Sequence, residues 1–414
     1  MRNRNLVRRL LVGLAAFAIF NVPIAAASNG PPPDAKFTTE GSVAHPSART
    51  IPWWSFGYTD PTNGVPYQIS MVGSDPRGGG STTVPTEVIP LKFNFVAGNQ
   101  DMSILDDYGG RFPGFRATAQ TATFDGGSKV AETLASPIFS TYKYPTDLGG
   151  DHGVQYGDAF MRAQFNKIGS SYHVKLGQPT VFPTVTISVP QNQGVAYYRP
   201  AGALAGTINS SWFSSQIDNL MTSMHVDSQT LVIFLTDNVL LYLGNYLRCC
   251  VLGYHGATSS SNTNGNGNVQ TFIYAGYGDP HDYPGFDLRG NADPTEGVSD
   301  IHGLSHEVAE WLDDPFANNV VQPWITPTAP FYGCAGLLET GDPVVGVWFP
   351  LSGNPDPAAG KVWHPEDEVF LSWFARNGEP AGLGPWSSYY TFMGPRTVAI
   401  GGDYASWAQL PATC

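Results

Sequence analysis

The sequence of 414 residues predicts an α+β fold, with a β-rich first half and a second half that mixes strands and helices. Hydrophobic residues make up 42% of the chain and aromatic residues 13%, which is enough apolar material for a folded core. β-branched residues are frequent in residues 82–95 and around 184–189, as expected for strands. Apolar side chains recur at helical spacing in residues 210–224 and 301–314. We therefore expect a mainly β region followed by a mixed one.

Local patterns predict the first elements of the chain. Gly78-Gly79-Gly80 predicts a turn before the strand within residues 82–95. The segment YGDAFMRAQF at residues 156–165 predicts a short helix. Ser210 opens a stronger helical pattern and is expected to be its N-cap, because a serine hydroxyl can accept a hydrogen bond from the first turn.

The next elements surround the most hydrophobic run of the chain, LVIFLTDNVLLYL at residues 231–243. This run predicts one central buried strand, or two strands that break at Asp237-Asn238. A polar loop is expected at residues 259–268 and another strand at 269–277. Residues 278–297 are rich in Pro, Gly and Asp and predict a second loop.

The chain begins with the pattern of a secretory signal peptide over residues 1–27. A basic start is followed by an apolar stretch at residues 10–20 and by Ala25-Ala26-Ala27 as a cleavage site. Residues 28–50 are rich in Pro, Ser and Thr and predict a flexible lead-in. We therefore expect a secreted or periplasmic protein, with no membrane association once the signal is cleaved.

The remaining chain is predicted to form a β-rich region at residues 51–205 and an α+β region at residues 206–414. The boundary is open, and one large domain is the alternative. The net charge of −13 makes nucleic acid and anionic membranes poor partners, because phosphate binding needs clustered Lys and Arg. An acidic chain is compatible with cation binding.

Four cysteines in an exported chain suggest disulfide bonds. The adjacent Cys249 and Cys250 are not expected to pair with each other, because that geometry is strained. Each is expected to reach one of the distant cysteines, Cys334 and Cys414, in an order left open. The alternative is that some of the four remain free and buried.

The segment SHEVAEWLDDP carries the strongest functional signal. On a helix, His306 and Glu310 leave the same face one turn apart and can share one metal ion. Glu307 stands where zinc hydrolases with an H-E-x-x-H motif keep their general base. Glu310, however, replaces the second histidine of that motif.

Residues 301–314 place apolar side chains on one side of the helix and polar ones on the other. The polar side carries His302, His306, Glu310 and Asp313, with Glu307 at its edge. The ordinary alternative is a solvent-exposed face. The lack of any Lys or Arg on this side instead favours a metal site in a cleft.

A catalytic zinc site usually has three protein ligands, so another ligand must come from elsewhere. Glu339 is the best candidate, and Asp342 follows it closely. The other candidates have ordinary structural explanations or compete with Glu310 as ligands: His255, His281, His302, Asp313 and Asp314.

The metal would activate a bound water, and Glu307 would accept its proton. Zinc is the expected ion, although one histidine and two carboxylates form a harder ligand set that admits other divalent metals. Such a set also reduces Lewis acidity, so a weakened or inactive descendant of a hydrolase is an alternative.

Three segments between about residues 230 and 345 resemble the plant EXORDIUM (phosphate-induced protein) family. They are CVLGYH at residues 250–255, the helix segment SHEVAEWLDDPFANN, and Glu339-Thr340-Gly341-Asp342. The chain also resembles a group of secreted bacterial proteins that share an IPxW opening, a VPTEVIPL strand and the same helix motif. The resemblance implies a joint site of His306, Glu310, Glu339 and Asp342, and it implies extracellular, wall-associated signalling as an alternative to catalysis.

The sequence thus favours a zincin-like second half, in which a strand precedes an active-site helix, and a secreted zinc-metallopeptidase-like hydrolase. Its substrate would be a peptide or another extracellular molecule. The alternative is a non-catalytic binding protein with a vestigial or structural metal site, which uses aromatic side chains to contact a cell-wall glycan. Core packing is the competing explanation for these aromatic residues: Trp53, Trp54, Trp363 and Trp373.

Overall fold

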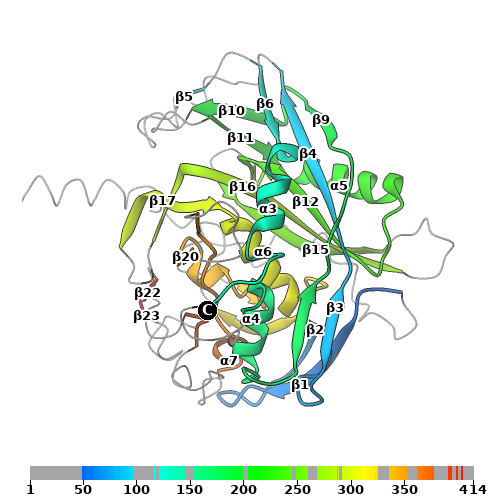
Figure 1. Cartoon of the computed structure of the whole chain (residues 1–414), viewed down its shortest axis with the longest axis vertical. Helices are drawn as coiled ribbons and strands as arrows, with labels where there is room; N and C mark the ends of the chain where they lie inside the picture. Colours follow the sequence, from blue (N-terminus) through cyan, green and yellow to red (C-terminus); the bar gives the residue numbers. More distant parts are fainter. Residues whose placement is uncertain are drawn as a thin grey trace, which may run out of the picture.

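The computed structural model describes most of the chain after residue 48. The described residues are 49–96, 116–117, 121–144, 153–198, 204–244, 249–259, 268–286, 288, 291–324, 335–352, 361–376, 390–393, 398–399 and 402–403. The helices are η2 (Gly126–Lys129), α3 (Val130–Ala135), α4 (Tyr156–Gln164), α5 (Ser210–Met224), α6 (His302–Asp313), η5 (Asp342–Val344) and α7 (Leu371–Phe374). Together with the strands, they confirm the predicted α+β class (Figure 1).

The larger of two main sheets has eight strands. They are β4 (Thr86–Phe95), β6 (Ala122–Asp125), β8 (Thr180–Val181), β9 (Val185–Val189), β12 (Leu231–Asp237), β15 (Gly253–Ser259), β16 (Val269–Phe286) and β17 (Ala292–Asp300). β12 lies at the centre and runs parallel to both β4 and β16. A strand covered on both faces needs apolar side chains throughout, which explains the hydrophobic run.

The second main sheet has five strands. They are β5 (Arg116–Ala117), β10 (Gly194–Tyr198), β11 (Leu204–Asn209), β13 (Val239–Tyr242) and β14 (Cys249–Val251). β13 follows β12 after the single residue Asn238, whose φ of 51° turns the chain from one sheet into the other. The run at 231–243 therefore forms two strands, as the second of the two predictions stated.

Five pairs of strands complete the β structure. They are β1 (Trp53–Thr59) with β2 (Pro66–Val72), β3 (Ser81–Val84) with β7 (His173–Leu176), β18 (Val320–Trp324) with β19 (Ala335–Leu337), β20 (Leu351–Ser352) with β21 (Val362–Trp363), and β22 (Val398–Ala399) with β23 (Gly402–Asp403).

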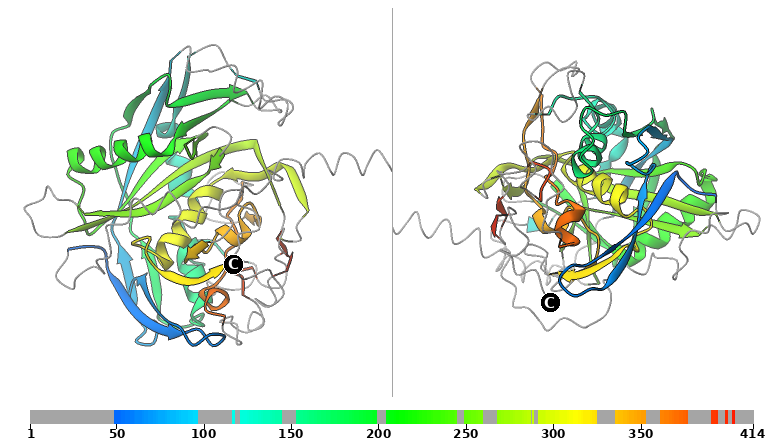
Figure 2. Two further views of the ribbon diagram at one scale, coloured as in Figure 1. Left: turned by 180° about the vertical axis from the view of Figure 1, so that it is seen from behind. Right: turned by 90° about the horizontal axis from the view of Figure 1, so that it is seen from below.

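The two faces of the large sheet are covered by different helices. Leu231, Ile233 and Leu235 of β12 join the core cluster that contains the apolar residues of α4 and α6. Val232 and Phe234, which point the other way, join the cluster that contains α5 and much of the five-stranded sheet. Figures 1 and 2 show α5 and α6 on opposite sides of the central strands.

The predicted β-rich and α+β regions both contribute strands to this sheet, and both contribute residues to the core clusters on its two faces. β4 comes from the first region, and its first half, residues 86–90, pairs with residues 231–235 of β12 from the second. Within the described residues, no helix is long and apolar enough to cross a membrane. The predicted signal peptide at residues 1–27, most of the lead-in at 28–50 and most of the loop at 259–268 lie outside the described residues.

Two local predictions were wrong. The loop expected at residues 278–297 is largely a hairpin, because β16 continues to Phe286 and pairs with β17 through irregular registers that its Gly and Pro residues allow. The N-cap of α5 is Asn209, and not Ser210. The Asn209 side chain accepts a hydrogen bond of 3.0 Å from the backbone N–H of Trp212.

Asn209→Ala should therefore destabilise the protein by about 1 kcal/mol, because it leaves a backbone N–H of the first turn without its acceptor. Ser210→Ala is the matched control and should change the free energy of unfolding much less, since alanine is the better helix former. Urea unfolding of both variants measures the difference. A larger loss for the serine variant would contradict the assigned cap.

Candidate metal centre

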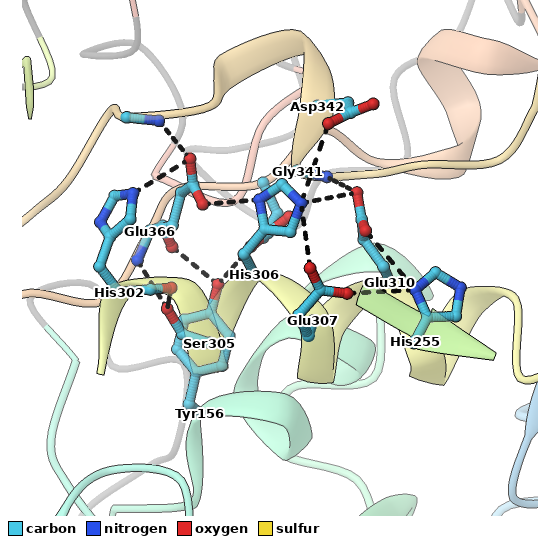
Figure 3. A network of polar contacts seen from close by, with 12 residues as sticks. Tyr156, His255, His302, Ser305, His306, Glu307, Glu310, Gly341, Asp342 and Glu366 are labelled. Carbon is cyan, nitrogen blue, oxygen red and sulfur yellow. Dashed lines mark hydrogen bonds and ion pairs between the residues drawn. The ribbon is translucent and has the colours of Figure 1, made fainter. Parts of the chain in front are cut away.

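The helix that carries the motif is buried on all sides. Every residue of α6 from His302 to Asp313 is buried. Its apolar side packs into the core between α4 and the large sheet, as predicted. The alternative that its polar side faces solvent was wrong. That side is covered by β15 and by later segments of the chain, which bring further acidic side chains to it (Figure 3).

His306 connects this buried cluster. Its Nδ1 lies 2.7 Å from Oε2 of Glu366, and its Nε2 lies 3.2 Å from Oε1 of Glu310. The same Nε2 is 3.9 Å from Asp342 Oδ1 and 4.0 Å from Glu307 Oε1. The contact of Nδ1 with Glu366 orients the ring so that Nε2 faces three carboxylates. In many metal sites, a carboxylate that contacts the other ring nitrogen orients the histidine ligand in this way.

Gly341 allows this arrangement by having no side chain. A Cβ atom at this position would come within 2.3 Å of Nδ1 of His306. The backbone N–H of Gly341 also donates a hydrogen bond of 3.1 Å to Oε1 of Glu310. The residue before Asp342 thus fits against the imidazole and orients the carboxylate of the motif at the same time.

His255 enters the cluster from β15. Its Nδ1 lies 3.3 Å from Oε2 of Glu307 and 3.6 Å from Oε2 of Glu310. Its Nε2 is buried and has no hydrogen-bond partner among the described residues. Sequence reasoning favoured a purely structural role for this histidine. The structure shows this histidine hydrogen-bonded to Glu307 and places its imidazole beside Glu310 as well, so its role as a ligand stays a prediction.

Two sets of possible metal ligands result, and they share one residue. The first consists of His306, Glu310 and Asp342, and the second of His255, Glu307 and Glu310. Within each set, the candidate ligand atoms lie within 4.8 Å of one another. Ligand atoms around a tetrahedral zinc ion are about 3.4 Å apart, because each lies roughly 2.1 Å from the ion. Small side-chain shifts would bring either set to that spacing.

Burial dominates the electrostatics of these carboxyl groups. It raises the pKa of Glu307 to about 7, and burial together with the charge of Glu310 raises the pKa of Asp342 to about 8. Burial acts in the same direction on Glu310, but His306 and His255 outweigh it and lower the pKa of that carboxyl. The cluster therefore holds more acidic groups than its histidines can neutralise.

Glu339, the first choice for a further ligand, lies half-buried beside the cluster. Burial and the nearby charge of Glu310 raise its pKa well above the usual value. Its oxygens belong to neither set of closely spaced ligand atoms, whereas those of Asp342 do. The role of Glu339 as a ligand stays a prediction.

Three of the weaker candidate ligands lie outside both sets and have other polar partners. His302 Nε2 lies 3.3 Å from Oε1 of Glu366 and does not belong to either set. Asp313 accepts a hydrogen bond from Gln164, and Asp314 accepts the backbone N–H groups of two residues after the helix end. Asp314 follows the last residue of α6 and stabilises the turn after it, which is an ordinary structural explanation for this residue. The side chain of His281 lies outside the described residues.

Sequence reasoning missed Glu366. It is fully buried, and its two oxygens face His302 and His306. Its backbone N–H donates to Oγ of Ser305, which ties the segment to α6. The available signal was the run His364-Pro365-Glu366-Asp367-Glu368, in which acidic residues follow a histidine without any basic residue.

Cys250 takes part in a disulfide bond, in keeping with the expectation for an exported chain. Which cysteine it pairs with stays a prediction.

Comparison with known proteins gives no relative: the chain matches no family model, no curated protein and no solved structure. The resemblance to the EXORDIUM family and the resemblance to secreted bacterial proteins therefore both stay predictions from short sequence segments.

Gly341→Ala should lower the free energy of unfolding by about 1 to 3 kcal/mol, since the new methyl group would overlap the His306 ring and force it away from Glu366. Gly336→Ala is the matched control, because a Cβ at that glycine meets no atom within 4 Å. Urea unfolding of both variants tests the close approach. Equal stability of the two variants would contradict it.

Proposed function

We propose that the protein is a metal-dependent hydrolase, most similar in mechanism to zinc metallopeptidases of the zincin type. His306, Glu310 and Asp342 would bind the metal, and zinc or another divalent ion fits this set of one nitrogen and two oxygen donors. The observation that carries the proposal is the orientation of His306, whose Nδ1 faces Glu366 while its Nε2 faces the other two ligands.

Glu307 is the candidate general base. A bound metal would supply a water molecule of lowered pKa and polarise a substrate carbonyl. The raised pKa of Glu307, about 7, lets its carboxylate accept a proton near neutral pH and pass it on to a leaving group. His255, 3.3 Å from Oε2 of Glu307, would hold the carboxylate in place. The substrate would be a peptide or another extracellular molecule with a hydrolysable carbonyl.

A non-catalytic binding or signalling protein with a structural metal is the second candidate, and the depth of the site favours it. His306 is 7% exposed and Glu307 is 3% exposed, which resembles a closed structural site more than an open cleft. Trp363 and Trp373 are buried in the core and therefore cannot contact a glycan. Trp53 and Trp54 of β1 are only partly buried and remain available for such contacts.

Metal content is the first test. The purified protein should contain a divalent metal in near-stoichiometric amount, measured by plasma mass spectrometry, and His306→Ala should lose most of it. His173→Ala is the matched control, because this histidine also pairs with a buried carboxylate, that of Asp158, but lies outside both ligand sets. A wild-type protein that stays metal-free after addition of zinc would exclude the hydrolase.

Glu307→Gln separates the catalytic from the structural role of the metal. In a hydrolase, this change should retain at least one bound metal and lower peptide turnover by about 10²- to 10⁴-fold, because the general base is lost. Glu87→Gln in β4 is the control for a carboxylate outside the site. Turnover of a fluorogenic peptide library measures the effect. If wild-type protein with bound metal cleaves none of the library, and chelation only lowers its melting temperature, the structural role holds.

A further inference from the structure

We propose that His255, Glu307 and Glu310 form a second divalent-cation site, directly beside the first, with Glu310 as a ligand common to both. The inference rests on the proposed function, because it assumes that the first cation is bound by His306, Glu310 and Asp342. It adds a binuclear centre, in which a second ion controls the residue that acts as the base.

Glu310 has the orientation of a bridging carboxylate. Its Oε1 lies 3.2 Å from Nε2 of His306, and its Oε2 lies 3.6 Å from Nδ1 of His255. Each oxygen therefore faces a different imidazole (Figure 3). Hydrolases with two metal ions hold them about 3.5 to 4 Å apart, a separation that one carboxylate can span with its two oxygens.

Glu307 completes the second set from the same helix. Its Oε2 lies 3.3 Å from Nδ1 of His255, and its side chain is packed against β15, where a Cβ on Gly253 would come within 2.7 Å of its Cγ. Glu307, Glu310 and His255 are each at least nine-tenths buried. The second set thus has the same composition as the first, one imidazole and two carboxylates, and all three of its residues are buried.

The balance of charge also favours two ions. The four carboxyl groups of both sets and of Glu366 face three imidazoles, and the ion pairs that Glu307, Glu310 and Glu366 make within the described part of the chain are all with these histidines. Buried charges need partners of opposite sign. A metal ion displaces the proton of the imidazole nitrogen that it binds, so with both sites filled the positive charge opposite the four carboxylates would come from two divalent ions.

A second ion changes what Glu307 does. With only the first site filled, its carboxylate is free to accept a proton. With both sites filled, it is a ligand and no longer a base. The concentration of divalent metal would then regulate the activity, with excess metal lowering turnover.

Metal stoichiometry tests the inference without any need for a substrate. The wild-type protein, His255→Ala, His306→Ala and His173→Ala would be dialysed against zinc and, separately, against manganese, and metal per chain measured by plasma mass spectrometry. The expected values are two ions for wild type and His173→Ala, and one for His255→Ala. Near-ultraviolet circular dichroism checks that each variant is folded, and His255→Gln replaces the alanine variant if that one is not.

The other outcomes separate this inference from the proposed function. One ion in the wild type that persists in His255→Ala and is lost in His306→Ala overturns the second site and leaves the hydrolase proposal standing. One ion that is lost in both variants indicates a single ion shared by the two histidines, which also overturns the second site. No ion in the wild type overturns both proposals.

Discussion

The structure depends on the complete burial of a helix that is polar along one side. α6 lies between the large sheet and α4, and both of its sides are removed from water. Burying ionisable side chains costs free energy unless partners of opposite charge or hydrogen-bond donors are present. The surrounding elements must therefore supply imidazoles, backbone N–H groups or cations to the acidic side chains of this helix.

The fold meets part of this demand with segments far apart in the sequence. β15 contributes His255, and the residues around Gly341 contribute a backbone N–H and space for an imidazole. The segment at 364–368 contributes Glu366, which orients His306 and is itself held by the O–H of Tyr156 on α4, a donor to its backbone carbonyl. A helix, a sheet edge and two loops thus form one network of polar contacts.

Local patterns were sufficient for much of this structure. The hydrophobic run at 231–243 identified the central strand and its break, because a single left-handed residue at Asn238 suits the Asp-Asn pair. The spacing of the motif identified α6, its buried apolar side and the joint position of His306 and Glu310. The partners of that helix were harder to identify, because they are brought in by tertiary packing. Nothing in the local sequence around Glu366 shows that its carboxylate contacts Nδ1 of His306.

The network also bears on when it can form during folding. Its histidines and carboxylates extend from residue 255 to residue 366, so no single helix or strand contains a complete set. Bringing such distant residues together requires closure of long loops, which is slow and entropically costly compared with forming a helix. We therefore expect the site to form late in folding. It is complete only after synthesis has passed residue 366, and a nascent or partly folded chain would offer a cation only scattered side chains.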